Sequence, residues 1–319
     1  MSLHSKIIIV GSGPAGYTAA IYAARSMLET TMIAGFEPGG QLMITTDVEN
    51  YPGFANVIQG PWLMEQMKLQ AEHVGTRMIS DHIVKAELNQ KPFKLYGDNG
   101  AVYTCDSLII STGAKAKWLG ISSEEKFKGF GVSACATCDG FFYRNKDVVV
   151  VGGGNSAVEE SLYLANLASK VTLVHRRDSL KAERILQERL FSHPKIEIIW
   201  NSAVEEICGT ENPPNVTHIK LKNTKSGKIT DLPTHGIFVA IGHSPASSVF
   251  KDQVQIHESG YISVKPGTAS TSIPGVFAAG DVADDVYRQA VTAAGMGCMA
   301  ALEAERWLTL SSSCQMAAE

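Results

Sequence analysis

Residues 6–26 read KIIIVGSGPAGYTAAIYAARS, which is an apolar and largely β-branched run, a glycine-rich turn and an alanine-rich helical pattern. Gly11, Gly13 and Gly16 stand in the G-x-G-x-x-G spacing of dinucleotide-binding turns. The first glycine permits the tight turn, the second lets the backbone approach a pyrophosphate, and the third lets helix and strand pack closely. The helix N-terminus then faces the negative charge. Because another apolar run follows at 30–35, the stretch predicts a parallel βαβ unit.

The same plan recurs about 140 residues later in the chain. Residues 146–168 read KDVVVVGGGNSAVEESLYLANLA, and the apolar run KVTLVH follows at 170–175. Gly152, Gly154 and Ala157 repeat the spacing, with alanine as an accepted third residue. Two such units predict an α/β protein with two Rossmann-like dinucleotide-binding domains. A solenoid is excluded, because its repeats would be only about 20–50 residues long.

Other segments fit around these two units. Two further strands are expected to end at Thr112-Gly113 and at Ile241-Gly242, where the chain would leave the first and the second βαβ domain respectively. Residues 273–284, IPGVFAAGDVAD, predict a further strand, and the apolar spacing of residues 287–308 predicts a helix. The serine-rich tail from Thr309 is expected to fray.

Length, charge and cysteine content exclude several classes of protein. The 319 residues are 45% hydrophobic and 19% charged, which suggests about two globular domains. A net charge of −4 gives no basic footprint for nucleic acid, and no apolar run reaches the roughly 18 residues of a membrane span. The N-terminus runs directly into the first strand, so we expect a mature, unexported chain in the cytoplasm. Six cysteines are too sparse for a secreted disulfide scaffold.

The end of the second unit's second strand is basic. Residues 175–184 read HRRDSLKAER, where an NAD-binding unit would carry an acid for the ribose hydroxyl. Arg176 and Arg177 would instead bind a 2′-phosphate through charge-assisted hydrogen bonds, and Lys181 and Arg184 stand close enough to add to them. A helix start is an unfavourable place for cations unless an anion binds there. The segment therefore predicts NADPH rather than NADH.

The first unit has no such basic cluster, and Glu37 lies near the acidic position. A different dinucleotide is expected there, and FAD is the economical choice. The residues Gly280-Asp281-Val282 at a predicted strand end support this choice. The aspartate can hydrogen-bond a ribityl or phosphate group, while the helix beyond it offers backbone N–H groups.

Residues 133–142, SACATCDGFF, hold the one close cysteine pair, Cys135 and Cys138, followed at once by Asp139. A structural zinc site needs four ligands, and no second cysteine or histidine pair is present, so we expect no metal. A static disulfide is unusual in the cytosol, which leaves a redox dithiol as the favoured interpretation. The spacing lowers the pKa of one thiol and lets either sulfur attack a mixed disulfide. Asp139 suits proton transfer, and it equally suits a simple Asp-Gly turn.

Further motifs accompany these: GGQL at 39–42, ENYPGF at 49–54 and YRQAVTAAGMGC at 287–298. With the glycine turns, ACATCDG, HRRD and GDV, they resemble the low-molecular-weight thioredoxin reductases, class II pyridine nucleotide-disulfide oxidoreductases, over nearly the whole chain. The CATCD run just before the second unit is the most specific. In larger disulfide reductases the redox cysteines follow the first unit, and residues 36–60 here contain none.

The resemblance implies a set of cofactor-binding residues that includes both glycine motifs. For FAD the set is Gly11, Ser12, Gly13, Pro14, Ala15, Gly16, Glu37, Gly39, Gly40, Gln41, Leu42, Asn50, Gly280, Asp281, Arg288, Gln289 and Ala290. For NADPH it is Gly152, Gly154, Asn155, Ser156, His175, Arg176, Arg177 and Lys181. The family usually carries arginine where Lys181 stands; a lysine keeps the charge but lacks the planar fork.

The resemblance also implies the activity of a thioredoxin-disulfide reductase. Electrons would pass from NADPH through FAD to the Cys135–Cys138 disulfide, and then to oxidised thioredoxin by thiol-disulfide exchange. Cys138 would face the flavin, Cys135 would attack the thioredoxin disulfide, and Asp139 would be the general acid.

The architecture implied by the resemblance is a split one. Residues 1–113 and 247–319 would form the FAD-binding domain, and 114–246 the inserted NADPH-binding domain that carries the cysteines. One domain would rotate against the other, because the nicotinamide and Cys138 cannot use one flavin face while Cys135 reaches a partner. The family is typically homodimeric.

Three other readings compete with this one. A flavoprotein that passes electrons from NADPH to ferredoxin would keep both nucleotide sites and lack Cys135 and Cys138. A reductase of a specialised peroxidase partner usually carries additional N-terminal redox domains. A redox sensor that only records oxidation would not turn over NADPH.

Overall fold

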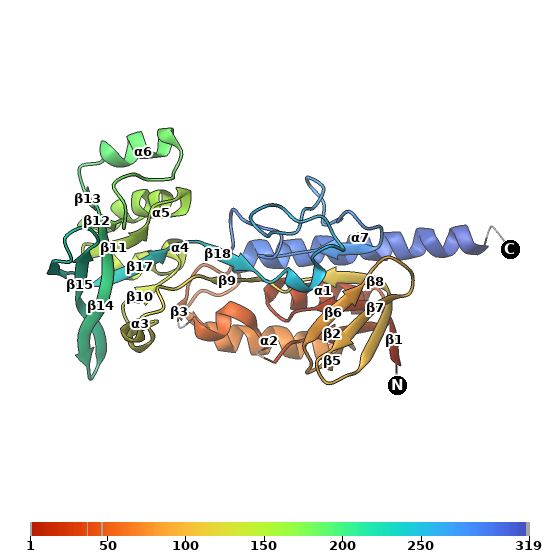
Figure 1. The fold of residues 1–319 in the computed structure, drawn as a ribbon. Coiled ribbons are helices and arrows are strands. Elements are labelled where there is room, and N and C mark those ends of the chain that lie inside the picture. The colour runs from red at the N-terminus through yellow and green to blue at the C-terminus, as the bar shows by residue number, and fades with distance from the viewer. Residues whose placement is uncertain (1, 37, 46, 317–319) are drawn as a thin grey trace. The chain divides into compact units, whose positions relative to one another are not determined.

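The computed structural model describes residues 2–36, 38–45 and 47–316 in two compact units (Figure 1). The first unit combines Met1–Lys115 with Ser244–Glu319, and the second is Ala116–His243. The boundaries expected from the sequence, after 113 and after 246, lie two and three residues from these crossings. Each unit contains a largely parallel sheet that begins with a βαβ unit, so the predicted α/β class with two Rossmann-like domains is confirmed.

The first unit contains a seven-stranded sheet in the order β5-β2-β1-β8-β7-β6, with β19 also paired to β8. Its strands are β1 (Ser2–Val10), β2 (Thr30–Ile33), β5 (Arg77–Ile79), β6 (Ile83–Glu87), β7 (Phe93–Gly97), β8 (Val102–Ile110) and β19 (Val276–Ala278). Its α-helices are α1 (Pro14–Arg25), α2 (Gly60–His73) and α7 (Ala290–Met316). Two short 3-10 helices are η1 (Gly40–Ile44) and η3 (Ser248–Phe250). A separate two-stranded antiparallel sheet pairs β3 (Asp47–Val48) with β4 (Ile58–Gln59).

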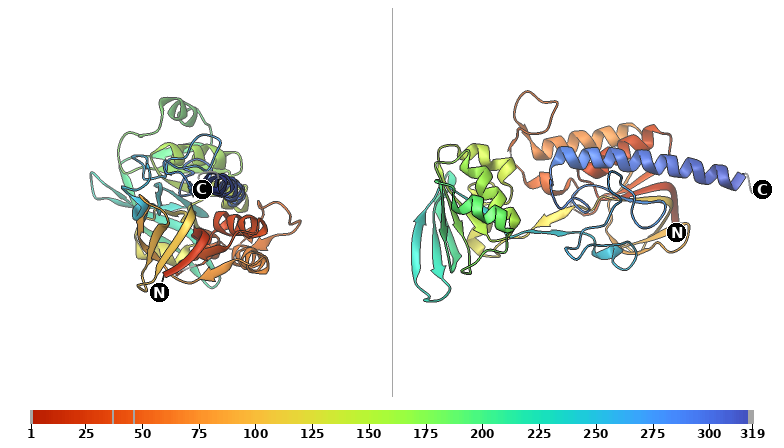
Figure 2. Two further views of the ribbon diagram at one scale, coloured as in Figure 1. Left: turned by 90° about the vertical axis from the view of Figure 1, so that its right-hand side faces the viewer. Right: turned by 90° about the horizontal axis from the view of Figure 1, so that it is seen from above.

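Strand β1 explains the layering of this unit, because its successive side chains point to opposite faces of the sheet. Ile7 and Ile9 pack into the cluster formed with α1, α2 and α7, whereas Ile8 and Val10 pack on the other face with side chains of β6, β7 and β8. Helix α7 runs beside α1 (Figures 1 and 2). The two helices approach so closely that a Cβ on Gly297 would lie 2.1 Å from the Ala15 carbonyl oxygen.

The second unit contains a five-stranded parallel sheet in the order β10-β17-β11-β12-β13 and a three-stranded antiparallel sheet, β14-β15-β16. Its strands are β10 (Val132–Ser133), β11 (Asp147–Gly152), β12 (Lys170–Val174), β13 (Ile196–Ile199), β14 (Ser202–Glu211), β15 (Pro214–Asn223), β16 (Ile229–Pro233) and β17 (Gly236–Ala240). Its helices are α3 (Ser122–Phe127), α4 (Ala136–Asp139), the 3-10 turn η2 (Gly140–Tyr143), α5 (Asn155–Ala165) and α6 (Arg184–Phe191).

The parallel sheet of the second unit is covered on both faces, which is why its strands are nearly continuous apolar runs. Val148 and Val150 of β11 pack into a cluster with α5 and α6. Val149 and Val151 pack on the opposite face against apolar side chains of β14 and β15. The result is a helix layer, a parallel sheet and an antiparallel sheet in one unit (Figure 2).

Two segments connect the units, β9 (Ala114–Ala116) and β18 (His243–Pro245), and they pair with each other. One sequence expectation was wrong near the C-terminus. Helix α7 does not end near residue 308 but continues to Met316, so the segment from Thr309 extends the helix rather than fraying. Among the described residues, none of the helices is both long enough and apolar enough to cross a membrane.

Candidate active site and dinucleotide loops

The glycine turn after β1 cannot accept side chains at two of its positions. Gly11 has φ of 106°, and a Cβ there would lie 2.3 Å from the Ser111 carbonyl oxygen. A Cβ on Gly16 would lie 2.0 Å from the Gly11 carbonyl oxygen. Gly13 is the N-cap of α1 and has open space around it, which leaves its backbone accessible to a ligand. These are the roles that the sequence spacing predicts for a pyrophosphate-binding turn.

A second loop lies against this turn. The Ser12 hydroxyl donates to the Ala34 carbonyl oxygen at 2.7 Å and accepts from the Gly39 N–H at 3.2 Å. A Cβ on Gly40 would lie 3.6 Å from the Gly13 Cα. The structure therefore brings Gly39 and Gly40 together with the first glycine turn, and Gln41 and Leu42 follow them in η1. Glu37, the predicted acidic residue, lies outside the described residues.

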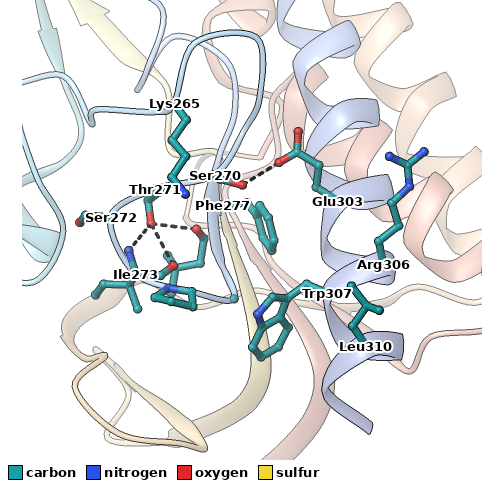
Figure 3. Close-up of a pocket in the computed structure, with 13 residues that line it drawn as sticks. Lys265, Ser270, Thr271, Ser272, Ile273, Phe277, Glu303, Arg306, Trp307 and Leu310 are labelled. Atoms are coloured by element: carbon teal, nitrogen blue, oxygen red, sulfur yellow. Dashed lines mark hydrogen bonds between the residues drawn. The ribbon is translucent and has the colours of Figure 1, made fainter. Parts of the chain in front are cut away.

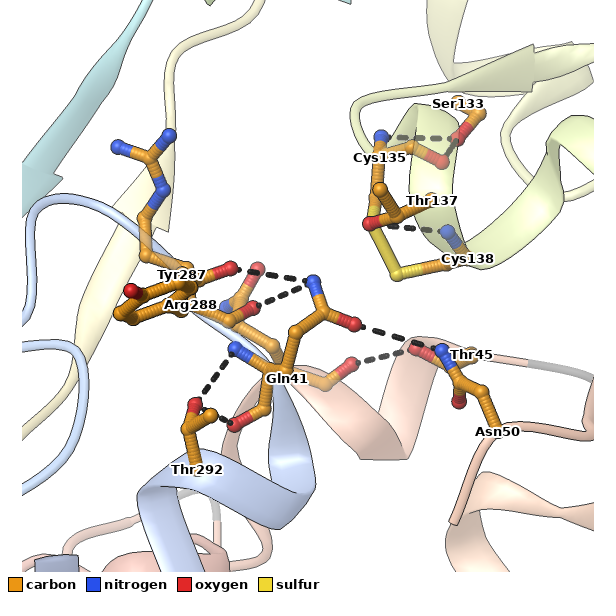
Figure 4. The surroundings of a disulfide bond; sticks show 11 residues. Gln41, Thr45, Asn50, Ser133, Cys135, Thr137, Cys138, Tyr287, Arg288 and Thr292 are labelled. Carbon is orange, nitrogen blue, oxygen red and sulfur yellow. Dashed lines mark hydrogen bonds between the residues drawn. A yellow bond between two sulfur atoms is a disulfide. The ribbon is translucent and has the colours of Figure 1, made fainter. Parts of the chain in front are cut away.

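The third segment of the first unit comes from the far end of the chain. A Cβ on Gly280 would lie 2.8 Å from the Ala15 Cβ, so the GDV stretch also reaches the glycine turn. The Asn50 side-chain amide donates to the Gln289 Oε1 at 3.3 Å (Figure 4), which joins residues 239 positions apart. Ala290 begins α7 directly after Gln289. Three loops separated in sequence thus converge on the N-terminus of α1.

Asp281 is an ionisable residue in the cradle formed by Gly11–Gly16, Gly39–Leu42 and Gly280-Asp281. Burial raises the pKa of its carboxyl to about 6, the negative charge of Asp284 adds to the rise, and Arg288 opposes it. The Asp284 carboxylate is itself held by the N–H groups of Val286, Tyr287 and Arg288, at 2.9–3.1 Å. A half-buried acid that costs free energy to ionise suits a position where a polar ligand would supply hydrogen bonds to it.

This raised pKa gives a first prediction. Because the folded protein binds more protons than the unfolded chain between the ordinary pKa of 3.8 and about 6, stability is lost as the pH rises through that window. In ligand-free protein, Asp281→Asn should therefore raise the free energy of unfolding by about 2 kcal/mol above this window and by little below it. Urea unfolding at about pH 5, inside the window, where only part of the gain should appear, and at about pH 7.5, where all of it should, measures this, with the exposed Asp285→Asn as control. A difference that does not change with pH would contradict the assignment.

The second unit repeats the glycine turn after β11. A Cβ on Gly152 would lie 2.3 Å from the Ala240 carbonyl oxygen and 2.6 Å from the Ala157 Cβ. Gly154 caps α5 and has open space around it. Asn155 and Ser156 follow as the first residues of that helix. His175, after β12, places its Nδ1 2.8 Å from the Gly152 carbonyl oxygen, and its Nε2 is buried without a hydrogen-bond partner among the described residues.

Four cations follow His175 in the second unit. Arg176, Arg177, Lys181 and Arg184 have exposed side chains and make no ion pair within the described part of the chain. One part of the sequence argument needs correction here. Helix α6 begins only at Arg184, so the other three cations lie in the loop before it rather than in a helix start. Unpaired cations gathered beside a glycine turn still favour an anionic ligand.

The cysteine pair follows the edge strand β10. Cys135 and Cys138 form a disulfide with an Sγ–Sγ distance of 2.07 Å, and both side chains are half-buried. The Cys138 N–H donates to the Cys135 Sγ at 3.2 Å, and the Thr137 hydroxyl lies 3.4 Å from the same sulfur (Figure 4). The Cys135 N–H donates to the Ser133 hydroxyl at 3.0 Å. The polar contacts therefore converge on Cys135 rather than Cys138.

The residues after the pair include some that the sequence did not single out. Asp139 ends α4 and is half-buried, and Tyr143 is close enough that the Asp139 charge adds to burial in raising the Tyr143 pKa to about 12. Phe141 and Phe142 are 56% and 38% exposed, with an edge-on ring contact at 6.4 Å. Two exposed aromatic rings therefore follow the disulfide directly in the chain. Adjacent phenylalanines after the C-x-x-C motif were the available sequence signal.

Three further cysteines and one pocket of the first unit contribute nothing to this site. Cys105, Cys208 and Cys298 are free thiols, and no group of three or more possible metal ligands occurs among the described residues. A pocket of about 360 Å³ lies between residues 265–277 and α7 (Figure 3). Its acid, Glu303, already accepts from the Ala269 N–H at 3.0 Å and the Ser270 hydroxyl at 2.9 Å. None of the predicted site residues lines it.

Comparison with known proteins places this arrangement in context. Residues 5–297 match the family model described as pyridine nucleotide-disulphide oxidoreductase. The chain is 59% identical to a thioredoxin reductase of Rickettsia conorii, over 97% of this chain and 99% of the relative, and 56% identical to one of Escherichia coli O157:H7, over 96% of both. Among solved structures, a thioredoxin reductase from Giardia duodenalis superposes with a TM-score of 0.93 at 44% identity, over 96% of this chain and 99% of that one.

Proposed function

Because this chain belongs to the pyridine nucleotide-disulphide oxidoreductases and, within them, to the low-molecular-weight thioredoxin reductases, we propose that it reduces oxidised thioredoxin with electrons from NADPH. Family membership makes it a disulfide oxidoreductase that uses a flavin and a pyridine nucleotide. The single observation that carries the finer proposal is the Cys135–Cys138 disulfide, which lies in the same unit as a glycine turn with four unpaired cations beside it.

We assign FAD to the first unit and NADPH to the second. The cradle of Gly11–Gly16, Gly39–Leu42 and Gly280-Asp281 fits a dinucleotide, because side chains are excluded where a pyrophosphate would approach. The turn Gly152–Ser156 fits another, and the buried, unpartnered Nε2 of His175 marks an unfilled polar position beside it. A bound flavin supplies two-electron chemistry between a reduced nicotinamide and a disulfide.

The chain's own residues carry out the exchange with thioredoxin. In the reduced pair, the Cys135 thiolate attacks one sulfur of the thioredoxin disulfide; that bond breaks as the Cys135–thioredoxin bond forms, and Asp139 protonates the leaving sulfur. Cys138 then attacks the Cys135 Sγ, which releases the second thioredoxin thiol and restores the Cys135–Cys138 disulfide. The N–H of Cys138 and the hydroxyl of Thr137 support Cys135 as the attacking group, since donors at a sulfur favour its thiolate.

We further propose that Phe141 and Phe142 contact the thioredoxin partner. Exposed aromatic rings are typical anchors of protein interfaces, and these two directly follow the redox helix α4. Replacing both with alanine should raise the KM for thioredoxin about tenfold, while reduction of a small aromatic disulfide stays unchanged. The control is Phe191→Ala on α6, which is 57% exposed. Equal effects on both substrates would assign the rings to the fold or the chemistry instead.

NADPH oxidation by FAD-loaded protein tests the proposed function directly. Oxidised thioredoxins, glutathione disulfide and ferredoxin serve as alternative acceptors, and we expect rapid turnover with a thioredoxin alone. Ferredoxin reduction would indicate a flavoprotein that does not use the cysteine pair. Absence of turnover with every acceptor would favour a redox sensor.

The assembly and compartment belong to the same proposal. We propose a homodimer, as the family resemblance implies, and a cytoplasmic location, as the cysteine content favours. The free thiols Cys105, Cys208 and Cys298 fit a reducing compartment, in which only a catalytic pair would cycle. Light scattering after gel filtration measures the mass of the assembly, and a monomer would contradict this part.

A further inference from the structure

We propose that Glu183 is a positioning residue for cofactor selection, which acts through Asn155 to fasten the cation-bearing loop to the glycine turn. The inference rests on the proposed function, because it assumes that NADPH binds the second unit. It assigns a role to a residue outside the HRRD motif and outside the predicted cofactor-contact set.

The first observation is a reciprocal pair of hydrogen bonds. The Asn155 Nδ2 donates to the Glu183 Oε1 at 3.2 Å, and the Glu183 N–H donates to the Asn155 Oδ1 at 2.9 Å. Asn155 is the first residue of α5, directly after the glycine turn. Glu183 is the N-cap of α6, and Arg184 follows it. The two bonds therefore join the starts of two helices that lie 28 residues apart in sequence.

The rest of the loop is tied to the same turn. The Lys181 N–H donates to the Gly153 carbonyl oxygen at 2.7 Å, and the His175 Nδ1 lies 2.8 Å from the Gly152 carbonyl oxygen. A Cβ on Gly153 would lie 2.2 Å from the His175 ring, so the contact leaves no room between them. These contacts hold the loop at residues 175 and 181, and the Asn155–Glu183 pair holds its far end.

The two arginines are supported from the opposite side. The Asn201 N–H donates to the Arg177 carbonyl oxygen at 3.0 Å, and the Thr224 hydroxyl donates to the Arg176 carbonyl oxygen at 3.2 Å. Their backbones are thus fixed by segments beside β13 and β15, while the glycine turn fixes the rest of the loop. Cations on a loop held at both ends are preorganised for a phosphate, which lowers the ordering cost of binding.

The negative charge of Glu183 allows a positioning role to be distinguished from a purely electrostatic one. A carboxylate among four cations weakens their attraction for a phosphate, so on charge alone its removal should tighten binding. If Glu183 positions the loop, its removal should weaken binding despite the gain in positive charge. The sign of the effect therefore separates a positioning role from a purely electrostatic one.

Calorimetric titration of FAD-loaded protein with NADP⁺ and NAD⁺ tests the proposal, independently of turnover. Glu183→Ala should raise the Kd for NADP⁺ about three- to tenfold, the range for loss of one hydrogen bond, and should change the Kd for NAD⁺ less. Glu183→Gln retains the acceptor oxygen and loses the charge, so its Kd for NADP⁺ should equal the wild-type value or fall. Glu188→Ala, an exposed acid on α6, is the matched control and should bind NADP⁺ at least as tightly as wild type.

A double-mutant cycle completes the test. In an Asn155→Ala background, Glu183→Ala should not weaken NADP⁺ binding any further, because its partner is already gone and only the loss of the negative charge remains. Thermal unfolding of each variant shows that the fold is retained. Unchanged or tighter NADP⁺ binding by Glu183→Ala, or additive effects in the cycle, would overturn the inference while leaving the proposed function intact. Failure of the wild type to bind NADP⁺ would overturn the proposed function itself.

Discussion

Replacing Cys138 with serine is expected to abolish NADPH-dependent reduction of thioredoxin, with a loss of about a thousandfold or more, as for removal of an enzyme's nucleophile. The physical reason is that the two electrons that reduce thioredoxin come from the reduced pair of cysteines. With a single thiol, the Cys135–Cys138 disulfide cannot re-form, so thioredoxin is not released. Cys135 alone would stop at a mixed disulfide with thioredoxin. Steady-state NADPH oxidation with oxidised thioredoxin measures the rate, and non-reducing electrophoresis detects the trapped complex.

Two controls make this result specific. Cys208→Ser removes a free, half-buried thiol from β14 and should leave the rate unchanged. Reduction of a small one-electron acceptor by Cys138→Ser should continue at the wild-type rate, because that reaction bypasses the dithiol. If Cys138→Ser instead reduced thioredoxin at the wild-type rate, the pair would not be the electron relay, and the reading of residues 133–142 as a redox centre would fail.

The parts of the fold that were predictable from sequence are those where local backbone constraints dictate the residue type. Gly11 and Gly16 could be assigned because a Cβ at either position meets a backbone carbonyl at 2.3 Å or less, so only glycine fits. The valine run of β11 could be assigned because both faces of that strand are buried. The C-x-x-C motif brings its sulfurs together within a single turn of chain. Each of these signals lies within a few consecutive residues.

What the sequence could not predict depends on contacts between distant segments. The hydrogen bond between Asn50 and Gln289 joins residues 239 positions apart, and no local sequence pattern predicts it. Helix α6 starts only at Arg184, and its cap, Glu183, is hydrogen-bonded to Asn155, 28 residues earlier in the chain. No local pattern in the basic stretch before it indicates that contact. The extent of α7 beyond residue 308 differs for another reason: a serine-rich composition favours fraying, but the helix continues through it to Met316.

Replacing Arg176 and Arg177 with alanine should raise the KM for NADPH by about a hundredfold or more and change kcat little. Each guanidinium is proposed to make a charge-assisted hydrogen bond to the 2′-phosphate, and such bonds contribute about 1.5–3 kcal/mol each. The KM for NADH should change only slightly, because NADH has no 2′-phosphate. The preference for NADPH should therefore fall by nearly the same factor as the affinity for NADPH.

A matched double variant separates the effect of losing two positive charges from the effect of losing Arg176 and Arg177 in particular. Arg25 and Arg77 are exposed in the first unit and make no ion pair among the described residues, so replacing both with alanine removes the same net charge. This variant should keep the wild-type ratio of KM values for NADH and NADPH. If the Arg176/Arg177 variant also kept that ratio, these two arginines would not recognise the 2′-phosphate. The glycine turn at Gly152–Ser156 would make the same contacts with both nucleotides, so cofactor selection would then have to come from the two remaining cations, Lys181 and Arg184.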